Sequence, residues 1–162
     1  LDLEKVIFML AVHELEEIII GDLTQFQISK EEKQKLGHKA VSTILKPLKN
    51  GEEIKALIME FDERESKEAK FAYFCDKLDA DLQCKLYDEE HCVDVDMEKD
   101  ARNIHNERVQ QLFDEGRSWS DLWMTFGEEK YSYDENFMKV SMFAKNNEIK
   151  LNKGTVLTVP FF

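Results

Sequence analysis

Residues 3–22 have the sequence LEKVIFMLAVHELEEIIIGD, the most apolar helical stretch of the chain. Its apolar side chains recur at steps of three and four residues, which is the spacing of one helix face. They are Leu3, Val6, Ile7, Leu10, Ala11, Leu15, Ile18 and Ile19. This pattern predicts one largely buried helix over residues 2–20. The helix should end at Gly21, because glycine readily adopts the left-handed conformation that closes a helix.

Further helices are predicted along the rest of the chain, each with apolar residues at helical spacing. Residues able to cap a helix N-terminus precede most of them, namely Ser29, Asn50, Ser66, Ser118 or Ser120, and Asp134. The helix after Ser66 should be long and should contain Asp76, and residues 97–115 should form another. We therefore predict an all-α bundle of about six to seven helices.

The length and charge of the chain limit its domain number and its partners. A chain of 162 residues can bury one hydrophobic core, so we expect a single domain over residues 1–162. It carries 34 acidic and 22 basic side chains, a formal net charge of −12. This charge repels phosphate polymers, so nucleic acid is excluded as a partner. A small phosphate ester remains compatible, because a bound cation can dominate the local field.

The cysteines and the hydropathy pattern indicate the compartment. Cys75, Cys84 and Cys92 show no C-x-x-C spacing, which argues against a disulfide framework and against a thiolate zinc site. No apolar run approaches the roughly 18 residues of a membrane span, and no segment resembles a signal peptide. These features predict a cytoplasmic protein that has no membrane partner.

Acidic residues interrupt the apolar stretch next to a histidine. Positions four apart share a helix face, so His13 and Glu17 can project into the same space, with Glu14 about 100° round from His13. Asp22 follows Gly21, where the chain can turn back over that face, and Asp76 lies on a second helix beside apolar neighbours. Helical bundles build metal sites by offering histidine and carboxylate side chains inward from two helices in this way.

A simpler interpretation stays open on the pattern alone. Glu14, Glu16 and Glu17 can be a solvated helix face, because charged residues are frequent in this chain. The other histidines have no second candidate ligand at helical spacing, so we expect them at the surface; they are His38, His91 and His105.

Two segments resemble one known family. Residues 13–22, HELEEIIIGD, closely resemble the H-D-x-x-E-x-x-x-G-D segment of the HD-domain nucleoside 5′-monophosphate phosphohydrolases, often called 5′-deoxynucleotidases. Residues 68–71, EAKF, and 76–79, DKLD, resemble the later helix of that family, whose Asp completes the metal site. The resemblance covers roughly residues 1–86 and implies an HD-domain helical bundle.

The resemblance also implies an activity and a set of site residues. The activity would be metal-dependent hydrolysis of nucleoside 5′-monophosphates to nucleoside and phosphate. The metal ligands would be His13, Glu14 and Asp76, and the catalytic residues would be Glu17 and Asp22. The metal would be Co²⁺, Mn²⁺ or a similar divalent ion, since several suit a set of imidazole and carboxylate ligands. A small phosphorylated substrate and a homodimer are the partners that the resemblance implies.

The chain departs from the family pattern at two points. Glu14 occupies the place of a metal-binding Asp, and its extra methylene moves the carboxylate by about one carbon–carbon bond. The first metal-binding His of the family lies on a helix before the H-D helix, so we expect this domain to lack its N-terminal helix or helices. Two alternatives therefore stay open. One is a degenerate HD fold that binds a ligand or a protein, and the other is an HD enzyme that acts on another nucleotide phosphate.

Overall fold

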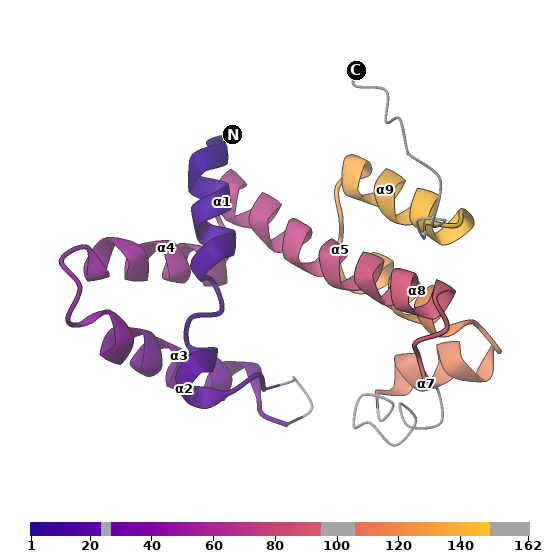
Figure 1. The fold of residues 1–162 in the computed structure, drawn as a ribbon, viewed down its shortest axis with the longest axis horizontal. Helices are drawn as coiled ribbons and strands as arrows, with labels where there is room; N and C mark the ends of the chain where they lie inside the picture. The colour runs from indigo at the N-terminus through magenta and orange to yellow at the C-terminus, as the bar shows by residue number, and fades with distance from the viewer. Residues whose placement is uncertain (24–26, 95–105, 150–162) are drawn as a thin grey trace. The chain divides into compact units, whose positions relative to one another are not determined.

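The computed structural model describes residues 1–23, 27–94 and 106–149, and these residues are mostly helical (Figure 1). Within them there is no β-strand, and all the helices except α2 have at least eight residues. The predicted all-α architecture of about six to seven helices is thereby confirmed. Of the helix expected over residues 97–115, only the part from Asn106 onward lies in the described ranges, and there α7 spans Glu107–Asp114.

The chain divides into two compact units, residues 1–79 and residues 80–162. Unit 1 contains α1 (Leu3–Val12), α2 (Glu17–Ile20), α3 (Lys30–Leu45), α4 (Gly51–Glu63) and the beginning of α5 (Lys67–Glu89). Unit 2 contains the remainder of α5 with α7, α8 (Trp119–Tyr131) and α9 (Glu135–Asn146). That residues 1–162 act as one domain stays a prediction.

Capping residues begin the helices of unit 1 largely where the sequence predicts. The Ser29 hydroxyl accepts a hydrogen bond from the Glu32 amide and begins α3. The Ser66 hydroxyl accepts one from the Ala69 amide and begins α5. Asn50 precedes α4 but makes no side-chain capping bond. These local bonds satisfy amide groups that have no partner within the helix, which is why the starts of α3 and α5 are readable from the sequence.

Two hydrophobic clusters hold unit 1 together. One joins α1, α4 and α5 through Val6, Met9, Phe61, Ala69 and Ala72. The other joins α3 and α4 through Val41, Leu45 and Ile58, with Val12 and Leu15 packed against it. The α1 helix and the turn after it therefore contact both clusters, which fixes the position of the residues that follow Val12.

The prediction of one continuous helix over residues 2–20 is wrong. Residues 13–16 form a turn between α1 and α2, in which the Leu15 amide donates to Val12 and the Glu17 amide donates to Glu14. These bonds span three residues, as in a 3₁₀ turn, instead of the four of an α-helix. Periodicity predicts which residues share a face, but it does not register a local change from four-residue to three-residue bonds.

The expectation that this segment is largely buried is also wrong. Val6 and Met9 are buried, but Ile7 is 66% exposed, Ile18 is 74% exposed and Ile19 is 53% exposed. The packing explains the difference, because the clusters of unit 1 engage one side of α1 and include none of these three isoleucines, which stay uncovered within the described chain.

Unit 2 has its own core. Val109, Leu112, Leu122 and Phe126 are buried together between α7 and α8. The ring of Trp123 packs against this cluster and meets the ring of Trp119 edge-on at 5.6 Å between centroids, so the two tryptophans serve in packing. Among the described residues, no helix is long and apolar enough to cross a lipid bilayer.

Candidate metal centre

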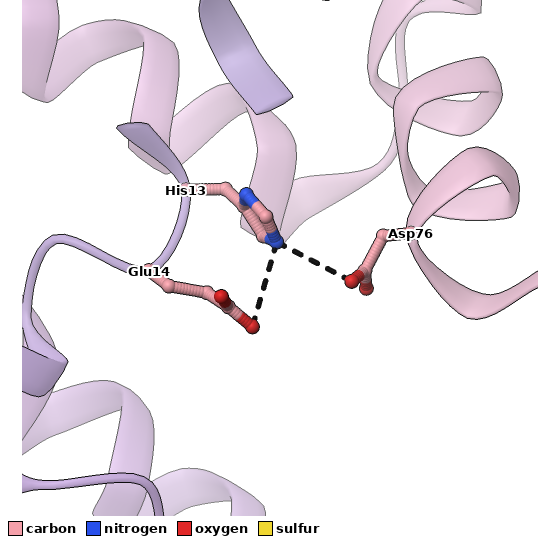
Figure 2. Close-up of side chains that lie close together, drawn as sticks. All are labelled: His13, Glu14 and Asp76. Carbon is pink, nitrogen blue, oxygen red and sulfur yellow. Dashed lines mark hydrogen bonds and ion pairs between the residues drawn. The ribbon is translucent and has the colours of Figure 1, made fainter. Parts of the chain in front are cut away.

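The three predicted ligands come together in unit 1, as Figure 2 shows. His13 and Glu14 lie in the turn that follows α1, and Asp76 lies on α5. The His13 Nε2 atom is 3.4 Å from Asp76 Oδ1 and 3.6 Å from Glu14 Oε1. One ligand atom from each residue lies within 4.8 Å of the other two, and this is the one such group among the described residues.

The orientation of the His13 ring is fixed from two sides. Its Nδ1 lies 2.9 Å from the Leu10 carbonyl oxygen, which can only accept, so Nδ1 carries a hydrogen and donates it. The ring also packs against Phe61, with 4.7 Å between centroids. Metal-binding histidines characteristically donate their other ring N–H to a carbonyl or carboxylate. Nε2 is therefore the nitrogen that faces the two carboxylates.

The charges of His13 and Asp76 are coupled. Burial disfavours the imidazolium, but the hydrogen bonds to Asp76 and Leu10 outweigh it and raise the pKa of His13 above 6.5. Burial likewise disfavours the Asp76 carboxylate, but the hydrogen bonds from His13 and Lys77 outweigh it and lower the pKa of Asp76 below 3.8. The site thus favours an ionised carboxylate beside a cation, and a proton on Nε2 competes with a metal for the same position.

The two carboxylates are held differently. The Lys77 ammonium lies 2.6 Å from Asp76 Oδ2, which leaves Oδ1 to face His13. The Asp76 side chain is 17% exposed, whereas that of Glu14 is 59% exposed. Asp76 is therefore a fixed ligand candidate, and Glu14 reaches the same point from the solvent side.

The spacing of the donor atoms fits a divalent cation. Metal–ligand bonds of about 2.1 Å place neighbouring ligand atoms about 3.0–3.5 Å apart in octahedral or tetrahedral geometry. The 3.4 Å from Nε2 to Asp76 Oδ1 falls within this range, and the 3.6 Å from Nε2 to Glu14 Oε1 lies just beyond it. One imidazole nitrogen and two carboxylate oxygens suit several first-row ions, so the donor set does not select among Mn²⁺, Co²⁺ and their neighbours.

The remaining predicted site residues lie outside this group of three. Glu17 begins α2, and its Oε1 is 3.3 Å from the Lys33 ammonium. Asp22 is exposed and follows Gly21, whose φ of 76° turns the chain at the end of α2. We expected His13 and Glu17 to share a helix face, but His13 lies beside Glu14 instead. The turn at residues 13–16 is the reason, because it changes which side chains are neighbours.

Sequence reasoning missed a second histidine–carboxylate pair. His38 Nε2 on α3 is 2.8 Å from Asp62 Oδ2 on α4, although the two residues are 24 positions apart and no local pattern connects them. Nearby, Glu16 has a buried Oε2 that meets no hydrogen-bond partner among the described residues. Burial is the main cause that raises the pKa of Glu16, and the charge of Asp62 adds to it. His91 is exposed as predicted, and His105 lies outside the described residues.

Comparison with known proteins identifies the family. Residues 1–117 match the HD domain family. The chain belongs to the HD domain family. This confirms the resemblance carried by residues 13–22 and 76–79. Membership implies the use of a divalent metal, and His13, Glu14 and Asp76 form a group among the described residues that could hold such an ion.

Two curated relatives of this HD-domain chain have names that state an activity. It is 35% identical over 92 residues to the 5′-deoxynucleotidase hdd1 of Schizosaccharomyces pombe, a match that covers 52% of this chain and 46% of that protein. It is 32% identical over 121 residues to the 5′-deoxynucleotidase HDDC2 of Dictyostelium discoideum, covering 72% of this chain and 58% of that protein. The chain thus spans about half the length of these relatives. No solved structure matches it significantly.

Proposed function

We propose that this HD-domain chain is a metal-dependent phosphohydrolase that hydrolyses nucleoside 5′-monophosphates to nucleoside and phosphate. One observation carries the proposal: His13 Nε2 faces an oxygen of Glu14 and an oxygen of Asp76 at ligand spacing, in a chain of the HD family. The names of the two relatives support the nucleotide substrate.

His13, Glu14 and Asp76 would hold the ion, and their chemistry supports this assignment. The Leu10 carbonyl keeps the His13 ring aimed, and Lys77 keeps one Asp76 oxygen turned toward it. A divalent ion, when bound, supplies the Lewis acidity that polarises phosphoryl oxygens. A net charge of −12 does not oppose this substrate, because the charge of the ion dominates at short range.

Glu17 and Asp22 divide the proton transfers of the proposed reaction. One carboxyl group orients the attacking water and accepts its proton as the new phosphorus–oxygen bond forms. The other gives a proton to the 5′ oxygen as the ester bond breaks, so that nucleoside and phosphate leave with their protons balanced. Both residues follow His13 and Glu14 closely in the chain, one at the start of α2 and the other just after it.

Phosphate release from a panel of nucleotides tests the proposal. The protein is stripped of metal, then assayed with added Mn²⁺, Co²⁺ or Mg²⁺ on nucleoside 5′-monophosphates, 3′-monophosphates and triphosphates. We expect metal-dependent release from the 5′-monophosphates, and we expect His13→Gln to lower the rate by at least about 100-fold. A matched control is His38→Gln, which alters the other His–Asp pair of unit 1 and should keep most of the activity. If no phosphate is released with any of the metals, the proposed enzymatic activity is excluded.

A second candidate function is a degenerate HD domain that binds a ligand or a protein without catalysis. The exposed Glu14 side chain in the ligand position favours it, because a loosely held carboxylate is a weaker ligand. Elemental analysis of the purified protein distinguishes the two, since a domain without a metal site carries no stoichiometric ion in either the wild type or His13→Gln. The homodimer and the cytoplasmic location expected from the sequence stay predictions.

A further inference from the structure

Lys33 makes two contacts that converge on the segment carrying Glu17 and Asp22. It lies in the first turns of α3, and its ammonium is 3.3 Å from Glu17 Oε1. The same ammonium donates a hydrogen bond of 2.8 Å to the backbone carbonyl of Leu23. Its side chain is 30% exposed and that of Glu17 is 22% exposed, so the pair is partly shielded from water.

The two contacts enclose a short and sharply turned stretch of chain. The Gly21 amide donates to the Glu17 carbonyl at 2.9 Å and ends α2. Gly21 then takes a φ of 76°, which glycine adopts without the steric cost that other residues meet. Asp22 follows directly and lies next to Leu23, whose carbonyl Lys33 holds. One ammonium thus ties the beginning and the end of the segment 17–23 to α3.

Stabilisation of the fold alone accounts poorly for the two contacts of Lys33. A partly exposed ion pair contributes about 0–1 kcal/mol to folding, and a neutral side chain in the first turns of α3 would serve the helix equally well. The bond to the Leu23 carbonyl adds a directional constraint on backbone, and it acts on the residue next to Asp22 instead of on the helix that carries Lys33.

We propose that Lys33 is a positioning residue that sets the Glu17 carboxylate and the Asp22 segment relative to each other. The inference rests on the proposed function, because it assigns the acid–base work to these two carboxyl groups. Lys33 is not part of the metal-ligand group, and it acts through its contacts with Glu17 and Leu23. Its loss should therefore impair proton transfer while metal binding is retained.

The test compares Lys33→Met, which keeps the length of the side chain and removes its charge, with Lys33→Arg, which keeps a cationic donor. Lys35→Met, an exposed position on the same helix, is the matched control. Lys33→Met should lower kcat for a nucleoside 5′-monophosphate by about 10- to 100-fold, since misplacement of a catalytic group by about 1 Å can have that effect. KM and the affinity for Mn²⁺ should stay within about twofold. Lys33→Arg should restore most of kcat.

Hydrogen exchange across residues 17–23 provides a readout that needs no catalysis. Lys33→Met should speed exchange there, and Lys33→Arg and Lys35→Met should leave it unchanged. A wild-type kcat in Lys33→Met, a loss of Mn²⁺ affinity, or unchanged exchange would each overturn the positioning role. If the wild-type protein releases no phosphate at all, the proposed function fails. The hydrogen-exchange experiment still decides whether Lys33 holds residues 17–23.

Discussion

Shortening Glu14 to aspartate should weaken metal binding, even though aspartate is the residue found at this position in the H-D-x-x-E pattern. Glu14 lies in the turn at residues 13–16. The length of its side chain brings Oε1 to 3.6 Å from His13 Nε2. An aspartate oxygen lies about 1.5 Å closer to the backbone. The turn therefore suits glutamate, whose longer side chain brings its carboxylate near the imidazole.

The size of the effect follows from this lost reach. If the oxygen retreats by about 1.5 Å, its separation from a divalent ion grows from about 2.1 to about 3.6 Å. Because the Glu14 side chain is 59% exposed, the attraction is screened nearly as in water. Coulomb's law at a dielectric constant of about 80 then gives a loss of about 1.7 kcal/mol, or about 15-fold in affinity.

Calorimetric titration of the metal-free protein with Mn²⁺ measures this affinity. Glu14→Asp should bind about 15-fold more weakly than the wild type. Glu14→Gln keeps the length and loses the charge, so it should also bind more weakly. Glu53→Asp applies the same shortening to an exposed residue of α4 and should leave the affinity unchanged.

Two results would refute the reasoning. Tighter or equal binding by Glu14→Asp, with weak binding by Glu14→Gln, would show that the residue is a ligand but that the turn does not limit its reach. Wild-type affinity in Glu14→Gln would remove Glu14 from the ligand set altogether.

Unit 2 offers two further predictions. Both are tested by following unfolding through tryptophan fluorescence, because Trp119 and Trp123 lie in that unit. Burial disfavours the Asp88 carboxylate, but two hydrogen bonds from Ser120 outweigh it and lower the pKa of Asp88 below 3.8. Asp88→Asn should therefore be about 1–2 kcal/mol less stable to unfolding than the wild type above pH 4. The difference should vanish as the pH falls through the lowered pKa of Asp88, and a difference that persists at pH 2 would contradict this. Gly127→Ala should destabilise unit 2 by about 1–3 kcal/mol, because the new methyl group meets the buried Asp81 carboxylate, and a fully stable variant would contradict that packing.

The features predicted correctly from the sequence are those set by neighbouring residues. Ser29, Ser66 and Asp134 begin their helices as expected, because a capping bond connects residues two or three apart. The overall helical class follows from apolar spacing, which the described residues retain. The predicted position of His13 and Asp76 on two helices makes them candidate ligands, the resemblance implies the same role, and the structure brings them together.

The features that the sequence did not predict depend on contacts between distant segments. Glu14, Glu16 and Glu17 look alike in the sequence, yet one faces His13, one packs against Gly37 and one pairs with Lys33. These three neighbouring acids make different contacts because of the turn at residues 13–16, and that turn forms where α2 and α3 pack together. Local periodicity contains no information about such packing.

The pairing of His13 with Asp76 joins chain positions 63 residues apart, while Glu14 is already the neighbour of His13. Closing a loop of this length costs the chain about 4 kcal/mol of conformational entropy. Before folding, the chain therefore presents two adjacent donors and a third that is far away, which makes a weak chelator. If these three residues hold the ion as proposed, strong chelation requires the folding of α3 and α4 between the two ends, so the ion would be captured after the chain has been synthesised.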